Sequence, residues 1–418
     1  MTLRVPRPAL MTLLALALSC GDDGAQPGDG ATPADRTAPE AVDDLVLSFD
    51  PGGDAVSFSW TSRRDDILRD RADHYDVRYG YAFPFDWERS IRIDDPPTPV
   101  PAGSTQHLVL IDPSRGRDLY ASIRAVDAAG NEAPVGVVAH VRIPGLTFEA
   151  TCVDALSGMP VAGLDALVTS SVAYHIVSGA DGRVTFDDLS EGTIGVLLTH
   201  GTASLPYHAF SDAFNLSDDV AISYSMIAFQ QPASPLYNSV LSLLIQAMTS
   251  LGTKKTIRHW TSFPIAWYAP SFVNSNGLDY RDLAERAATR WNVRTGLPLF
   301  AVSASDPAVG VAFEFLPRSV MGGQVAVTEP TLDAGGYPLH DRVKVVDDFA
   351  DEARLYSIMM HELGHTLGLQ HLPAGFIMYG SQPLPADITD DEVAVVRLLE
   401  SLPNGVDLLK YNAAPPTP

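Results

Sequence analysis

Three histidines and a glutamate within one short stretch could together hold a metal ion and transfer a proton. Residues 361–371 read HELGHTLGLQH, so His361 and His365 are four positions apart. On an α-helix with 3.6 residues per turn, this spacing places both imidazoles on one face, one turn apart. Two imidazole nitrogens can then bind one zinc ion at about 2.0–2.1 Å each.

The rest of this stretch can supply a third ligand and a base. Glycine tolerates the positive φ that ends a helix, so Gly368 allows the chain to turn back and bring His371 to the same metal. Three histidines leave a fourth position open for water, which is typical of a catalytic zinc site. Glu362 lies beside the metal and can take a proton from that water. The alternative is a helix whose histidines merely lie on its surface.

These residues match H-E-x-x-H-x-x-G-x-x-H, the signature of the metzincin clan of zinc peptidases. Residues 376–380 resemble the Met-turn of that clan, with Met378 as the methionine beneath the metal. The Met378-Tyr379 pair is similar to that of the matrixins, although Leu372 stands where matrixins usually have serine. The resemblance implies a metalloendopeptidase with one catalytic Zn²⁺, with Glu362 as its general base.

A catalytic domain over residues 256–411 has to position these groups. Alternating polarity predicts strands at 264–268, 309–315, 322–330 and 343–346. Apolar spacing and capping residues predict helices at 279–295, from about 355, and at 393–399 after the capping box Thr389–Glu392. This order resembles the matrixin catalytic core and implies an α+β fold with a mixed, twisted sheet and a zinc-binding helix.

The resemblance also implies a substrate-binding strand. Its members would be Gly323, Gln324, Val325, Ala326 and Val327, at the sheet edge above the cleft. Free backbone groups on such an edge can pair with an extended peptide. An ordinary edge strand is the alternative.

Matrixins often carry a further structural zinc ion and calcium ions near this strand. A thin remnant of the ligands of such ions is present here as His340, Asp341, Asp347 and Asp348, so the resemblance implies a candidate structural Ca²⁺. The alternative interpretation of these four residues is a set of solvated loop charges.

The N-terminus has the features of a targeting segment. Residues 1–19 combine a positive start with an apolar run at 9–18 that is too short to span a bilayer. The end of this segment resembles the lipobox of bacterial lipoproteins, which implies a lipidated Cys20 and an anchor in the outer membrane. An ordinary cleaved signal of a secreted protein is the alternative. Residues 20–38 have almost no large apolar groups and predict a flexible linker.

Two all-β sandwiches are predicted between this linker and the catalytic domain. Residues 39–144 resemble a fibronectin type III domain, with Trp60, a tyrosine corner at Tyr120 and a turn at 127–131. Residues 145–230 resemble the carboxypeptidase regulatory-like, transthyretin-like domains and contain Cys152 as a buried thiol. Residues 231–255 predict a linker with a helix that packs on a neighbour, and residues 412–418 predict a disordered tail.

Composition limits the classes of function. The chain has 418 residues, enough for two to four domains, and a formal net charge of −23, which disfavours binding to nucleic acid. With Cys20 lipidated, Cys152 has no disulfide partner among the two cysteines. We therefore expect a monomeric, membrane-anchored zinc endopeptidase in the cell envelope that acts on protein substrates. The alternatives are a catalytically silent surface binding or adhesion protein with a remnant zinc domain, and a zinc hydrolase of non-peptide substrates.

Overall fold

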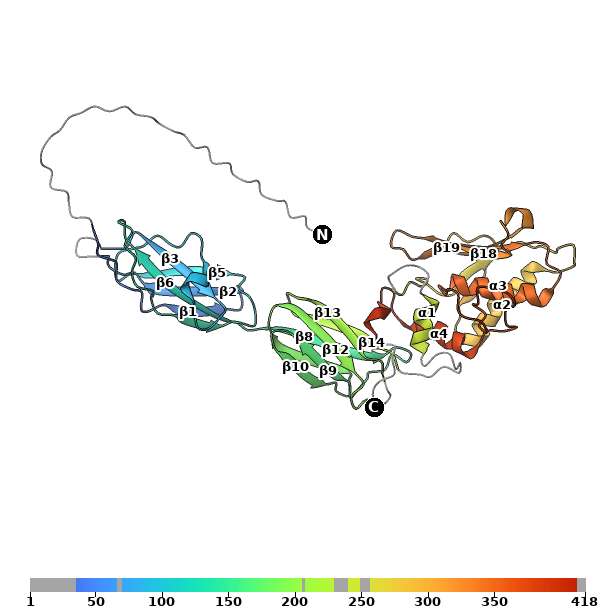
Figure 1. The fold of residues 1–418 in the computed structure, drawn as a ribbon, viewed down its shortest axis with the longest axis horizontal. Coiled ribbons are helices and arrows are strands. Elements are labelled where there is room, and N and C mark those ends of the chain that lie inside the picture. The colour runs from blue at the N-terminus through green and yellow to red at the C-terminus, as the bar shows by residue number, and fades with distance from the viewer. Residues whose placement is uncertain (1–34, 66–69, 205–206, 229–239, 249–255, 412–418) are drawn as a thin grey trace, which may run out of the picture. The chain divides into compact units, whose positions relative to one another are not determined.

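The computed structural model describes residues 35–65, 70–204, 207–228, 240–248 and 256–411. The predicted signal segment, Cys20, most of the linker and the tail at 412–418 lie outside these residues. The described chain is multidomain and mostly β-sheet, and its α-helices all follow residue 239 (Figure 1). None of the helices in this part is long and apolar enough to span a membrane. The chain divides near residue 141 into two compact units, which are considered separately.

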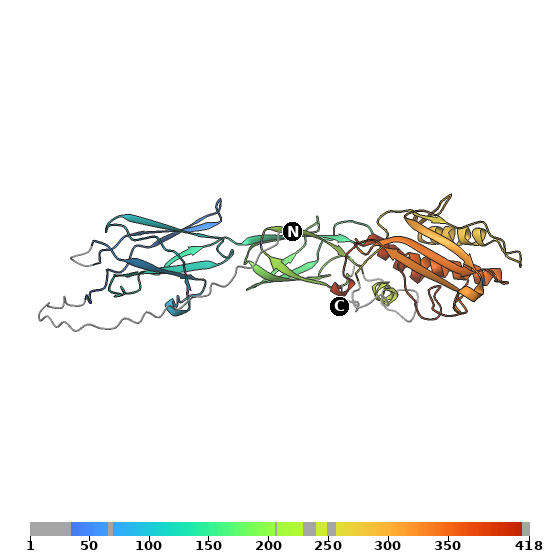
Figure 2. The same cartoon turned by 90° about the horizontal axis from the view of Figure 1, so that it is seen from above.

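The first unit is a β-sandwich whose two sheets form two layers (Figure 2). One sheet has the order β1-β2-β5 and the other β4-β3-β6-β7. Trp60 and Tyr75 are buried between them, with an edge-to-face contact at 5.4 Å between ring centroids. The strands are β1 (Val46–Asp50), β2 (Ala55–Thr61), β3 (His74–Gly80), β4 (Ile91–Arg92), β5 (Thr105–Ile111), β6 (Asp118–Val126) and β7 (Ala139–Arg142).

The structure corrects one core residue of this sandwich. Along β6 the side chains alternate, and Leu119 is fully buried whereas Tyr120 is half-exposed and stacks on His140. The prediction of Tyr120 as a buried tyrosine corner is therefore wrong, because successive side chains of a strand point to opposite faces and the buried face here takes Leu119 and Ala121. The predicted turn at 127–131 is confirmed, because the Asp127 carboxylate accepts the backbone N–H of Ala129 and of Asn131.

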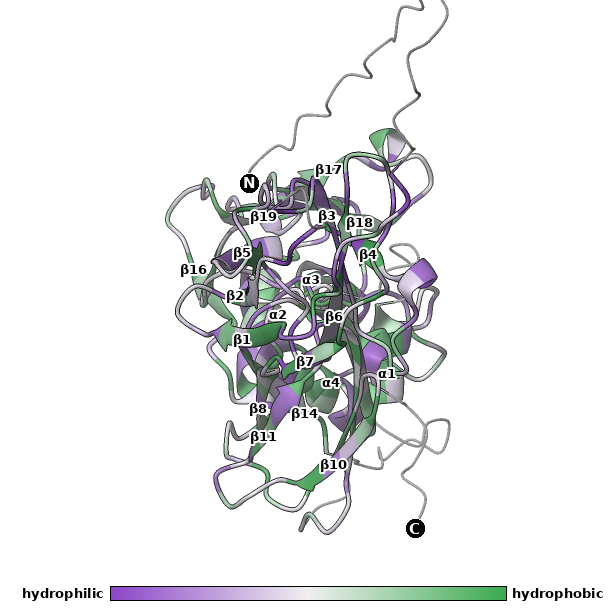
Figure 3. Ribbon diagram, turned by 90° about the vertical axis from the view of Figure 1, so that its left-hand side faces the viewer, coloured by the Kyte–Doolittle hydropathy of each residue, from purple (hydrophilic) through white to green (hydrophobic). Residues whose placement is uncertain are grey.

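The second unit begins with another β-sandwich. Its sheets have the orders β11-β8-β14 and β10-β9-β12-β13, and hydrophobic and hydrophilic residues mix along the strands (Figure 3). Cys152 lies on β8 with no exposed surface, and burial raises the pKa of its thiol to about 12, so the predicted buried thiol is confirmed. The strands are β8 (Leu146–Asp154), β9 (Asp165–Thr169), β10 (Ala173–Val177), β11 (Arg183–Leu189), β12 (Gly192–Thr199), β13 (Phe210–Leu216) and β14 (Val220–Met226).

The C-terminal part of this unit contains a five-stranded mixed sheet of order β16-β15-β17-β19-β18. The neighbouring pairs β16–β15, β15–β17 and β17–β19 are parallel. At the sheet edge, β18 pairs antiparallel with β19. The predicted strands at 264–268 and 309–315 are confirmed, whereas β16 was not predicted. The strands are β15 (Ile265–Tyr268), β16 (Phe300–Val302), β17 (Gly310–Leu316), β18 (Ala326–Leu332) and β19 (Pro338–Val346).

The edge of this sheet differs from the prediction at both strands. β18 begins at Ala326 because Gly322 and Gly323 adopt positive φ and form a turn, so Gly323, Gln324 and Val325 are not part of the strand. It also continues past Pro330, since a proline is tolerated on an edge strand, where its missing N–H need not pair. β19 is correspondingly longer than the predicted strand at 343–346.

Two long helices pack against each other and on this sheet. In α2 (Tyr280–Thr295), Asp279 caps the first turn and a stripe of small residues with Trp291 is buried, as predicted. α3 (Glu352–Thr366) begins three residues before the predicted start at about 355, because the Asp351 side chain accepts the backbone N–H of Arg354 and caps the helix there.

Two further helices complete this part of the chain. α4 (Asp390–Ser401) begins with the predicted capping box of Thr389 and Glu392 and extends beyond the predicted range at both ends. α1 (Val240–Ala247) packs against α4, which confirms a linker helix that packs on a neighbour.

Candidate metal centre

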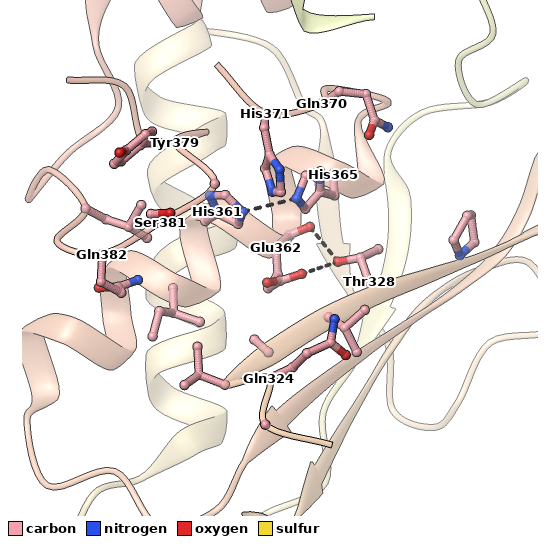
Figure 4. A pocket seen from close by; sticks show the side chains of 18 residues that line it. Gln324, Thr328, His361, Glu362, His365, Gln370, His371, Tyr379, Ser381 and Gln382 are labelled. Atoms are coloured by element: carbon pink, nitrogen blue, oxygen red, sulfur yellow. Dashed lines mark hydrogen bonds between the residues drawn. The ribbon is translucent and has the colours of Figure 1, made fainter. Parts of the chain in front are cut away.

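α3 presents His361 and His365 on one face, and the segment after the helix brings His371 to them (Figure 4). One ring nitrogen from each histidine lies within 4.8 Å of those of the other two. The ring centroids are 4.7 Å apart for His361 and His365, and 5.3 and 5.0 Å from these rings to His371. The structure thus brings all three predicted ligands to one point.

The hydrogen bonds of the His361 and His365 rings leave one nitrogen of each ring free to bind a cation. Nδ1 of His361 lies 2.7 Å from the carbonyl oxygen of Ile377, and Nδ1 of His365 lies 2.7 Å from that of Leu369. Each Nδ1 must therefore carry the hydrogen, which leaves the lone pair of a neutral ring on Nε2.

The two Nε2 atoms lie 3.1 Å apart, where two lone pairs would repel each other. Burial lowers the pKa of His361 and of His365 to about 4, which favours the neutral rings. Two ligands of a tetrahedral zinc would have their nitrogens about 3.3 Å apart. The donor set of three imidazoles and the spacing of these two Nε2 atoms therefore fit a zinc ion.

His371 is exposed, and two glycines, Gly368 and Gly380, determine where it lies. Gly368 has a φ of 87°, which turns the chain back after α3, and its N–H donates to the carbonyl of His365. A Cβ on Gly380 would lie 2.7 Å from Nδ1 of His371, so the ring rests directly on this glycine. The predicted role of Gly368 in the turn agrees with this geometry, whereas the contact of Gly380 was not predicted.

Met378 packs against α3, the helix that carries His361 and His365. It is fully buried, and its sulfur occupies the space that a Cβ on Gly364 of α3 would need. Its backbone N–H donates to Oε1 of Glu392 at 2.9 Å, while Oε2 of the same side chain completes the capping box of α4. The sequence motif indicated the capping box of Glu392, but nothing in it indicated this second bond, which ties α4 to the turn around Met378.

Substitution of Gly364 by alanine is expected to destabilise the protein. In most helix interiors this change stabilises by about 1 kcal/mol. Here the new methyl group would collide with the Met378 sulfur and lie 3.3 Å from the Trp291 ring, both of which are buried. Overpacking of this kind costs about 1–3 kcal/mol. Denaturant unfolding of the metal-free protein would measure the loss, and an unchanged or higher free energy of unfolding would contradict this packing.

Glu362 is buried beside the three histidines, with 5% of its surface exposed. Oε2 of its carboxylate lies 2.7 Å from the hydroxyl of Thr328 on β18, and this hydroxyl also lies 3.1 Å from the carbonyl oxygen of Glu362 (Figure 4). Burial raises the pKa of Glu362 to about 7, against the lowering effect of the Thr328 hydrogen bond. Thr328 was not among the predicted site residues, because its neighbours in the sequence suggest only a strand.

An open cleft of about 570 Å³ runs along these groups. Gly323, Gln324, Val325, Ala326 and Val327 all line the cleft, although only Ala326 and Val327 belong to the edge strand β18. The side chains that line it away from the histidines are neutral, among them those of Ile358, Gln370, Tyr379, Ser381, Gln382 and Leu384. The cleft therefore extends from the three histidines to the open edge of the sheet.

The candidate calcium ligands do not form a site in the described part of the chain. His340 and Asp341 lie on β19 rather than in a loop, and His340 lies 2.9 Å from the carboxylate of Asp306. Asp341 is buried, and burial raises its pKa to about 7, so the interpretation of solvated loop charges is wrong for this residue. Asp348 pairs with Arg318. No metal-binding group found among the described residues contains any of the four candidates.

Comparisons with known proteins concern the fold alone. No protein-family profile and no curated protein sequence matches this chain. It is similar to the structure of an Fn3-like protein from Clostridium thermocellum, with 18% identity, 26% of this chain and 97% of that chain covered, and a TM-score of 0.20.

Two further solved structures are similar to parts of the chain. The Bacillus anthracis TIE protein has 9% identity, with 45% of this chain and 39% of that chain covered and a TM-score of 0.27. The group B streptococcus pilus 2b backbone protein has 12% identity, with 46% and 96% covered and a TM-score of 0.21. At such low identities and TM-scores, none of these similarities indicates a function for this chain.

Proposed function

We propose that this chain is a zinc-dependent metalloendopeptidase of the metzincin type, similar to the matrixins, which hydrolyses peptide bonds in proteins. The observation that carries the proposal is the convergence of three imidazoles beside a buried carboxylate in an open cleft. The spacing H-E-x-x-H-x-x-G-x-x-H supports it, because that motif accompanies this chemistry in the clan. The buried methionine under the helix is a second, independent feature in its favour.

Each group at the site has a role in this proposal. His361, His365 and His371 would hold the zinc ion, which supplies Lewis-acid polarisation of the scissile carbonyl and of the attacking water. Glu362 takes a proton from that water and later delivers it to the leaving amine. Ala326 and Val327 lie on the edge strand β18, whose open side can pair with the backbone of an extended peptide.

The proposal includes a place of action outside the cytoplasm. The apolar N-terminal run and its ending at Cys20 support export and lipid anchoring in a bacterial cell envelope. Protein substrates would then be encountered outside the cell or in the envelope.

Removal of the metal tests the proposed activity directly. Residues 21–418, which lack the predicted signal segment and the predicted lipidation site Cys20, would be incubated with denatured casein or gelatin, with and without a zinc chelator, and the zinc content of the protein measured. We expect one zinc per chain, and cleavage that stops on chelation and returns when zinc is added back. His371→Ala is expected to remove cleavage, whereas His107→Ala, on an exposed strand position of the first sandwich, is expected to retain it.

The opposite outcome has a definite meaning. One bound zinc per chain without cleavage of either substrate would contradict a broad endopeptidase. It would favour the alternative of a surface binding protein with a catalytically silent zinc domain.

A further inference from the structure

The contact between Thr328 and Glu362 joins the edge strand to the proposed general base. The Thr328 hydroxyl lies 2.7 Å from Oε2 of Glu362, and within the described chain it is the one side chain found to hydrogen-bond this carboxylate. A hydroxyl carries a single hydrogen, so it can donate either to Oε2 or to the Glu362 carbonyl oxygen 3.1 Å away. No side chain in the described part of the chain is found to bond Oε1 of Glu362, so this oxygen is left for other partners.

Thr328 is well suited to hold a neighbouring group in place. Its backbone is fixed by the antiparallel pairing of β18 with β19, where it lies opposite the fully buried Val343. Its β-branched side chain has restricted rotation about χ1, which keeps the hydroxyl in one direction. Glu362 itself is on α3, so its three side-chain torsions would otherwise be limited only by packing.

We infer that Thr328 is a positioning residue for the proposed peptidase reaction, which is the function on which this inference rests. Its hydroxyl holds Oε2 of Glu362, so that Oε1 is the oxygen that takes the proton from the attacking water and returns it to the leaving amine. The strand that would pair with the substrate thereby also orients the base.

Kinetics of two substitutions test this role. Thr328→Val keeps the shape of the side chain and removes the hydroxyl, and it is expected to lower kcat about 10–100-fold with KM changed less than about twofold. Thr328→Ser restores the hydroxyl and is expected to recover kcat to within about threefold of the parent. Thr185→Val, at an exposed threonine on β11 of the second sandwich, is the matched control and should equal the parent. A valine variant with parental kcat, or a serine variant as slow as the valine one, would overturn the inference.

A second measurement does not depend on activity. Crystal structures of the metal-free parent, Thr328→Val and Thr328→Ser would show whether the Glu362 carboxylate leaves its position when the hydroxyl is absent. We expect it to turn in the valine variant and to stay in the serine variant, and an unmoved carboxylate in Thr328→Val overturns the inference. If the parent cleaved no peptide, the proposed function would fail, and these structures would still decide whether Thr328 positions Glu362.

Discussion

Substitution of Glu362 by alanine is expected to abolish peptide hydrolysis while zinc and fold are retained. The side chain is not one of the three converging ligands, so its removal leaves the metal-binding point intact. Loss of a general acid and base typically lowers a rate about 10²–10⁴-fold. Among the residues that the structure describes, Thr328 is the one side chain found to hydrogen-bond this buried carboxylate. Removal of the carboxylate therefore leaves the Thr328 hydroxyl in need of a new acceptor, and the backbone carbonyl oxygen of residue 362 is already 3.1 Å away.

Cleavage of denatured casein, zinc content and thermal unfolding would be measured on the same preparation of Glu362→Ala. The matched control is Glu352→Ala in the first turn of the same helix, an exposed residue that pairs with Arg286. The control is expected to cleave at the parental rate. Parental activity in Glu362→Ala would show that another group moves the proton, and loss of zinc from it would show that Glu362 holds the metal site together.

The parts of the site that could be predicted depend on local spacing. His361 and His365 share a face because they are four residues apart in a helix, and helix geometry alone decides this. Gly368 was predicted as a turn residue because glycine adopts a positive φ more readily than any other residue type. Its φ is 87°. The N-caps Asp279 and Thr389 were recognised in the same way, since a cap is a contact between residues only a few positions apart.

The parts that could not be predicted depend on contacts between distant residues. Thr328 and Glu362 are 34 positions apart, and only the pairing of β18 at the edge of the sheet brings them together. Glu392 was recognised as a cap, but its bond to the Met378 backbone joins two segments whose approach no local pattern encodes. Asp341 looked like a solvated charge because periodicity cannot distinguish a loop from the end of a long strand.

The expected result for Gly380→Ala is a loss of zinc affinity without a loss of fold stability. The new Cβ would lie 2.7 Å from Nδ1 and 2.9 Å from Cγ of His371, far inside normal contact distances. The ring is exposed, so it can swing outward instead of forcing the backbone to move. In doing so it leaves the point that it shares with His361 and His365. Disturbing a group that orients a metal ligand typically lowers affinity or activity about 10–100-fold.

Competition with a chromophoric chelator would give the zinc affinity of Gly380→Ala, and thermal unfolding of the metal-free protein would give its stability. Gly80→Ala is the matched control, because its Cβ would meet only a Phe85 carbon at 4.0 Å, and it should bind zinc like the parent. His371→Ala sets the affinity expected when the third ligand is absent. If Gly380→Ala bound zinc as tightly as the parent, the position of His371 would not depend on Gly380.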